Sequence, residues 1–137
     1  MELIQFPFER VVEINVHILK TEPGHKGIID LAKLQGALGR IDNAIAYQGL
    51  NDVFEIAAKY ATAIAVAHAF PDANKRTALA VCLEYLSLND FELTSDNDLL
   101  ADAIKDLVIG TIDENDFADV LYGQFIQDHS TPYRPTS

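Results

Sequence analysis

The chain has 137 residues, the size of a single domain whose core is large enough to need no disulfide bonds. Its 21 Asp and Glu against 10 Lys and Arg give a formal net charge of −11, which argues against a nucleic-acid partner. Neither a signal peptide nor an apolar run of the roughly 20 residues that cross a bilayer is evident, so we expect a cytoplasmic protein. Cys82 is the single cysteine, which excludes a disulfide framework and predicts a buried, inert thiol.

Helical periodicity dominates the chain from its start. Apolar residues at helical spacing predict a first helix over residues 8–19 and a second over residues 31–45. The segment "TEPGHKGII" between them is expected to be a loop because of its Pro and Gly residues. Asp30 is expected to cap the second helix, and Asp52, after a break at "GLND", to cap a third.

The third predicted helix extends from about Val53 to about Ala69. Its many alanines suggest close packing against neighbours, as for a central helix. Residues at spacings of four and three, from Phe54 onwards, define its inward stripe. On this pattern His68 is expected to lie on the inward stripe near the helix end.

The remaining apolar patterns predict three more helices. A fourth is expected from about Asn74 to near residue 88, a fifth over residues 100–107, and a sixth over residues 117–125. The β-leaning segment "FELTS" could also pair with "LIQF" near the N-terminus. The sequence therefore predicts an all-α, single compact domain of about six helices over residues 1–128, with or without one short β pairing. Residues 129–137 are expected to form a polar tail.

The stretch "HAFPDANKR" gathers ionisable residues between the third and fourth predicted helices. A helix start presents unpaired backbone N–H groups and a partial positive charge, which suit a phosphate group. Asn74 is a preferred N-cap residue type, and Lys75 and Arg76 would lie in the first turn. Because cations there oppose the helix dipole unless an anion is bound, the pattern predicts a polyanion site.

Asp72 and His68 could complete a reactive site at this helix start. Asp72 either caps the helix or holds a hard cation such as Mg²⁺ beside the phosphates. A neutral His68 imidazole could accept a proton from an attacking hydroxyl, so the set matches phosphoryl or nucleotidyl transfer. Each residue taken alone also has a structural interpretation: a core histidine, capping residues and a solvated Lys-Arg turn. Phe70 is expected to be a core anchor in both cases.

The stretch "HAFPDANKRTAL" resembles the signature of the Fic/Doc superfamily, H-x-F-x-[D/E]-[G/A]-N-[G/K]-R. It is most similar to the death-on-curing (Doc) branch, whose typical version reads H-x-F-x-D-A-N-K-R-T-A-L. Every fixed position matches, and the resemblance extends from about Gly27 to about Leu86.

The resemblance implies a Fic-type helical core and a bacterial or phage toxin of a toxin–antitoxin system. Doc-type members are associated with transfer of the terminal phosphate of ATP to a threonine of elongation factor Tu, which halts translation. By matched position, His68 would be the base and Asp72 would bind Mg²⁺. Asn74, Lys75 and Arg76 would hold the nucleotide phosphates, and Phe70 would anchor the motif.

Two positions bear on which reaction the resemblance implies. Members that transfer AMP usually have Gly where Lys75 stands and a second Arg where Leu79 stands. Both differences favour phosphate transfer over AMP transfer. The Lys75 side chain would occupy room that a phosphate needs in the members that transfer AMP, and Leu79 stands where those members have their second Arg. Val66 and Ala80 are apolar where Doc-like proteins can carry polar groups, and would weaken nucleotide affinity or turnover.

Regulation and target binding are also implied by the resemblance. The inhibitory pattern [S/T]-x-x-x-E-[G/N] of many Fic proteins is absent from the sequence, so the expected inhibitor is a separate Phd-type antitoxin. His25 and Lys26 fall where the family has its target-positioning flap, although a solvated loop is the simpler interpretation. Three hypotheses remain: an ATP-dependent protein-threonine kinase toxin, an AMP transferase that uses the same His68, and a non-catalytic binding module.

Overall fold

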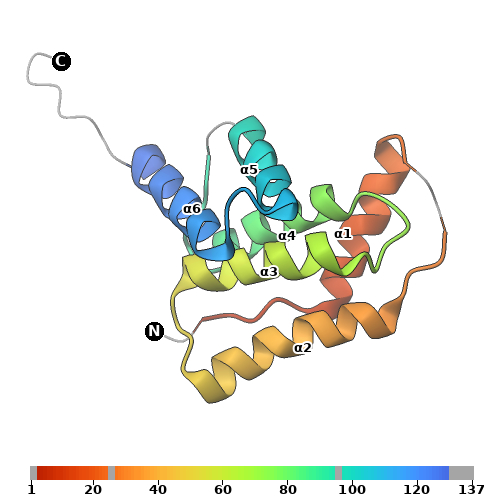
Figure 1. Cartoon of the computed structure of the whole chain (residues 1–137), viewed down its shortest axis with the longest axis horizontal. Coiled ribbons are helices and arrows are strands. Elements are labelled where there is room, and N and C mark those ends of the chain that lie inside the picture. The colour runs from red at the N-terminus through yellow and green to blue at the C-terminus, as the bar shows by residue number, and fades with distance from the viewer. Residues whose placement is uncertain (1–2, 25–26, 95–96, 130–137) are drawn as a thin grey trace, which may run out of the picture.

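The computed structural model describes residues 3–24, 27–94 and 97–129, and six helices account for most of them (Figure 1). They are α1 (Phe8–Thr21), α2 (Leu31–Gln48), α3 (Val53–Ala67), α4 (Asn74–Leu88), α5 (Asn97–Ile109) and α6 (Glu114–His129). The predicted all-α architecture is confirmed.

Helix α3 is the central element of the core. It packs against α2, α4, α5 and α6, while α1 packs against α4 (Figure 1). Ala57, Ala58, Ala61 and Ala65 of α3 are all buried, and their small side chains let four neighbouring helices approach it closely. The central helix predicted from the alanine-rich stretch is therefore confirmed.

The starts of α2 and α3 are capped as predicted. The carboxylate of Asp30 accepts a hydrogen bond from the backbone N–H of Lys33 at 3.1 Å. That of Asp52 accepts from the N–H groups of Phe54 at 2.9 Å and Glu55 at 3.0 Å. Each cap satisfies amides that the helix itself leaves unpaired, which fixes where the helix begins.

The sequence suggested a short β pairing between residues 3–6 and 91–95. This prediction is wrong within the described residues, because residues 3–6 and 91–94 contain no strand. The buried side chain of Asn89 holds the N-terminal segment instead. Its Oδ1 accepts from the N–H of Ile4 at 2.7 Å, and its Nδ2 donates to the Ile4 carbonyl at 3.2 Å and the Tyr85 carbonyl at 3.0 Å. Phe91 packs against the rings of Phe54 and Phe125, so its side chain joins the helical core rather than a sheet.

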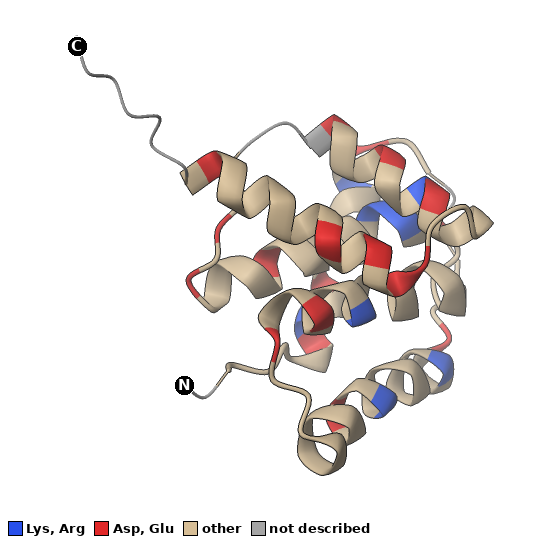
Figure 2. Ribbon diagram, turned by 60° about the vertical axis from the view of Figure 1, so that its left-hand side comes forward, with Lys and Arg blue, Asp and Glu red and all other residues tan. Residues whose placement is uncertain are grey.

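Acidic residues are spread over all parts of the fold, whereas basic residues are fewer (Figure 2). Several acids gather on α6 and the loop before it: Asp113, Glu114, Asp116 and Asp119. Within the described residues, no helix combines the length and the apolar character that crossing a membrane requires.

Cys82 is fully buried in α4, and burial raises the pKa of its thiol. Because the thiolate is the nucleophile, the native protein is expected to resist iodoacetamide even at pH 9, whereas the urea-unfolded chain is labelled and reacts faster as pH rises. Mass spectrometry of the alkylated chain measures this difference. Complete labelling of the native protein at the rate of the unfolded chain would contradict the buried thiol.

Candidate active site

The loop that joins α3 to α4 is bounded by two residues in the left-handed backbone region. His68 ends α3 with a φ of 53°, and Ala73 precedes α4 with a φ of 62°. Neither residue is glycine, and an L-residue in this region costs about 1 kcal/mol or more. The surrounding contacts must therefore hold the loop in a conformation that it would not adopt alone.

His68 is exposed, so the prediction that it lies on the inward stripe of α3 is wrong. Helix α3 ends at Ala67, and the left-handed turn at His68 breaks the helical spacing on which that prediction depended. The structural interpretation of His68 as a core histidine fails for the same reason. Its imidazole is accessible to a substrate.

Phe70 and Asn74 fix the middle of the loop. The ring of Phe70 is buried in the core. The side chain of Asn74 binds the backbone of Phe70 twice: its Oδ1 accepts from the N–H at 3.2 Å, and its Nδ2 donates to the carbonyl at 3.0 Å. The prediction of Asn74 as N-cap is therefore wrong, because its amide closes the loop from within α4.

Ala73 occupies the N-cap position of α4 and has no side-chain acceptor to offer. This helix start differs from those of α2 and α3, where an Asp side chain accepts from the first-turn amides. The first turn also carries Lys75, which is exposed, and Arg76. The combination leaves a helix start that suits an anionic group.

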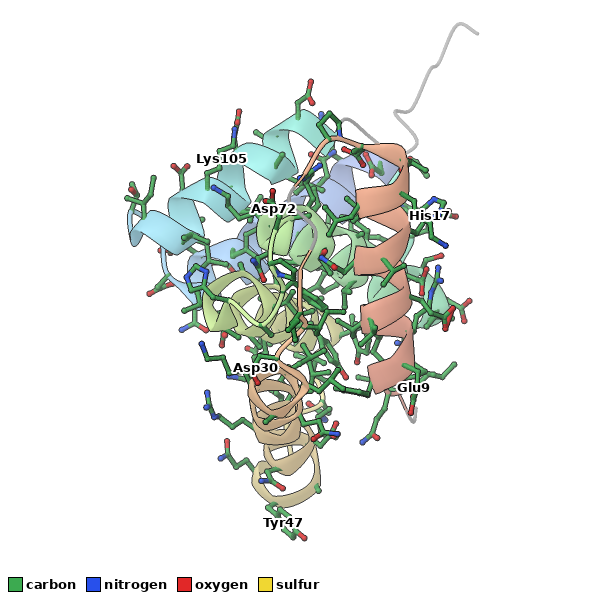
Figure 3. The ribbon with its side chains drawn as sticks, turned by 90° about the vertical axis from the view of Figure 1, so that its right-hand side faces the viewer. Glu9, His17, Asp30, Tyr47, Asp72 and Lys105 are labelled. Carbon is green, nitrogen blue, oxygen red and sulfur yellow. The ribbon has the colours of Figure 1, made fainter. Side chains whose placement is uncertain are left out.

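Asp72 lies at this helix start, with a side chain that is 43% exposed. Its Oδ1 accepts a hydrogen bond from the N–H of Ala73 at 2.7 Å and lies 4.0 Å from Nη2 of Arg76. Figure 3 shows Asp72 at the level of the C-terminal half of α1, far from Tyr47 at the end of α2. The carboxylate is thus next to both the helix start and a cation.

Arg76 connects the loop to the end of α1. Its Nη1 donates to the carbonyl of Pro23 at 3.2 Å and to Oε1 of Glu22 at 3.4 Å. A Cβ added to Gly24 would lie 3.3 Å from Oδ2 of Asp72 and 3.4 Å from Nη2 of Arg76. The backbone that leaves α1 therefore passes directly against two of the predicted site residues. His25 and Lys26, which follow it, lie outside the described residues.

Asn15 is a residue that the sequence analysis missed. It is buried on α1, and its Nδ2 donates to the carbonyl of Asp72 and to Oγ1 of Thr77, both at 3.0 Å. The sequence does contain a signal for this residue. Asn15 lies four residues after Val11 and three before Ile18, so it is a polar residue at an inward position of an otherwise apolar stripe.

A magnesium ion that arrives with a nucleotide fits this arrangement. Mg²⁺ is usually held by one or two carboxylates together with substrate phosphates, and Asp72 supplies one accessible carboxylate beside the helix start. Among the residues that the structure describes, no three His, Cys, Asp or Glu side chains gather as a metal site. The donor set therefore fits a shared metal–nucleotide site rather than a cage built by protein alone.

The fold and site together define an all-α domain in which a strained loop joins two core helices. An exposed histidine lies at the first end of this loop, and a carboxylate and two cationic side chains lie at the helix start that follows it. The Fic/DOC family model matches residues 5–86, and the chain belongs to this family. It is 37% identical over 98 residues to "Protein kinase doc" of Escherichia phage P1, an alignment that covers 72% of this chain and 77% of that relative. The resemblance to the death-on-curing branch is confirmed.

Proposed function

We propose that the protein is a Doc-type toxin that transfers the terminal phosphate of ATP to a hydroxyl of a protein and thereby inhibits translation. A threonine of elongation factor Tu is the target that we propose. The observation that supports this function best is an exposed histidine at one end of a fixed loop whose other end is a helix start without a side-chain cap. The name of the phage P1 relative, a protein kinase, supports phosphate transfer in particular.

In the proposed reaction, the His68 imidazole takes the proton of the target hydroxyl, and the hydroxyl oxygen forms a bond to the terminal phosphorus. The bond from that phosphorus to the bridging oxygen breaks, and ADP leaves. Lys75, Arg76 and the first amides of α4 would bind the phosphates. Asp72 would hold magnesium, which neutralises phosphate charge when bound.

Arg76 would have to exchange partners for this role. Its contacts to Glu22 and Pro23 are 3.4 and 3.2 Å long, and its side chain is 39% exposed. Exposed charge pairs of this kind contribute little to stability, so a phosphate can replace them at low cost. Because the side chain of Asn74 is hydrogen-bonded to the backbone of Phe70, Asn74 would contact the phosphates through its backbone amide, as the first residue of α4.

AMP transfer by the same loop is the second candidate, and Lys75 and Leu79 argue against it. Lys75 is exposed at the helix start and carries a long cationic side chain where AMP-transferring relatives have Gly. Leu79 is partly buried against the core and offers no charge where they have a second Arg. Val66 is half exposed near the end of α3 and supplies no polar contact to a nucleotide.

Transfer of label from ATP tests the proposal directly. Purified elongation factor Tu, and separately a bacterial lysate, are incubated with the protein and with ATP labelled at either the α or the γ phosphate. We expect the protein target to acquire label from the γ position only. Label from the α position would replace the kinase by the AMP transferase, and no transfer from either would leave a binding module without turnover.

Doc-type toxins are generally paired with an antitoxin. We propose that the partner here is a Phd-type antitoxin on a separate chain, and that the protein acts in the cytoplasm, where ATP and elongation factor Tu are found. The sequence itself contains no inhibitory [S/T]-x-x-x-E-[G/N] pattern, which supports inhibition by another chain. Neither a nucleic acid nor a membrane is part of the proposal.

A further inference from the structure

We infer that Asn15 is a positioning residue that holds the Asp72 end of the loop and the first turn of α4 in the geometry that binds the nucleotide. The nucleotide part of this inference rests on the proposed function. The structural part, which concerns the loop alone, does not depend on it.

The position of Asn15 requires polar partners. It is 1% exposed, and its neighbours on the same stripe of α1 are Val11, Ile14, Ile18 and Leu19. A buried side-chain amide without hydrogen-bond partners would be energetically costly. Nδ2 of Asn15 has one partner in the loop, the Asp72 carbonyl, and one in the first turn of α4, the Thr77 hydroxyl. Asn15 thus links α1 to residues 57 and 62 positions away in the chain.

Its two hydrogen bonds span the helix start. One partner, the Asp72 carbonyl, comes just before the left-handed Ala73; the other, the Thr77 hydroxyl, is fully buried in the first turn. The N–H of Thr77 also donates to the Ala73 carbonyl at 2.8 Å. Because the carbonyl and the carboxylate belong to the same residue, fixing the carbonyl of Asp72 restricts where its carboxylate can point.

The chain offers a matched control in Asn89. It is 3% exposed and, like Asn15, uses its side chain to hold backbone from a distant segment. Asn89 lies at the opposite end of α4, where its partners are Ile4 and Tyr85. Asn89→Leu therefore removes a buried Asn of the same kind without touching the loop.

The test compares Asn15→Leu with Asn89→Leu in the full chain, at a temperature where circular dichroism shows both to be folded. Deuterium uptake is measured in peptides covering residues 69–79, together with the dissociation constant of MgATP. We expect Asn15→Leu to speed uptake in these peptides and to weaken MgATP binding about tenfold, the effect of one or two lost hydrogen bonds. Asn89→Leu should leave both within about twofold of the unsubstituted protein. Equal effects of the two substitutions, or uptake in residues 69–79 unchanged by Asn15→Leu, would overturn the inference.

A second variant, Asn15→Asp, keeps the shape of the side chain and covers the case in which the Leu variant does not fold. Whatever its protonation state, an Asp can donate at most one of the two hydrogen bonds that Nδ2 of Asn15 makes. Loop uptake should therefore be faster, and MgATP affinity lower, than in the unsubstituted protein and than in the control Asn89→Asp. Loop uptake in Asn15→Asp equal to that of the unsubstituted protein or of Asn89→Asp would contradict the inference. If the unsubstituted protein binds no MgATP, the proposed function fails, and the exchange measurement still decides the role of Asn15.

Discussion

Replacing His68 by alanine is expected to lower phosphate transfer by roughly 10²- to 10⁴-fold, the usual contribution of a general base. The same change should alter the free energy of unfolding by less than about 0.5 kcal/mol, because the side chain is exposed. Initial rates with γ-labelled ATP, together with urea unfolding of each variant, measure the two effects.

His17→Ala is a matched control for this prediction. His17 is also exposed, but it lies on the outer side of α1, away from the loop (Figure 3). It should keep full activity and full stability. A His68→Ala variant that transfers phosphate at the normal rate would remove His68 from the mechanism, and one that unfolds would make it a structural residue.

Replacing Phe70 by alanine is expected to lower the free energy of unfolding by about 3–5 kcal/mol, as for other large aromatic side chains in cores. Phe70 is 4% exposed, and Asn74 binds its backbone on both sides. Removal of the ring would therefore leave a cavity beneath the loop that carries His68 and Asp72. Urea unfolding followed by circular dichroism gives the free energy.

Tyr47→Ala serves as the control, since this aromatic side chain is 85% exposed at the far end of α2 (Figure 3). Its loss should leave the urea midpoint almost unchanged. If Phe70→Ala were equally mild, the buried ring would not be what secures the loop, and the hydrogen bonds of Asn74 and Asn15 would have to do so.

Much of the fold could be predicted because its signals are local. Apolar spacing identified all six helices, and Asp30 and Asp52 marked two helix starts correctly, since a capping side chain binds amides only two or three residues away. The alanines of α3 predicted a central helix for an equally direct reason, namely that small side chains permit close neighbours.

The site was harder to predict, and the errors have physical causes. Helical spacing placed His68 inward because it assumed that the helix continues through this residue. The helix instead ends at Ala67, because His68 itself adopts the left-handed conformation. Residue-type preference made Asn74 a cap, yet the same amide gains two bonds by binding Phe70. The inward position of Asn15 could be read from the apolar stripe of α1, but its partners lie 57 and 62 residues away, so no local pattern identifies them.

The left-handed backbone at His68 has a consequence for how the sequence can change. Glycine adopts this conformation without the steric cost that a side chain meets there, so His68→Gly should stabilise the fold by up to about 1 kcal/mol while it removes the proposed base. Directed evolution for thermal resistance alone would therefore favour variants without the histidine. Stability and the proposed activity would oppose each other at this position, and only selection for the proposed reaction would keep the imidazole there.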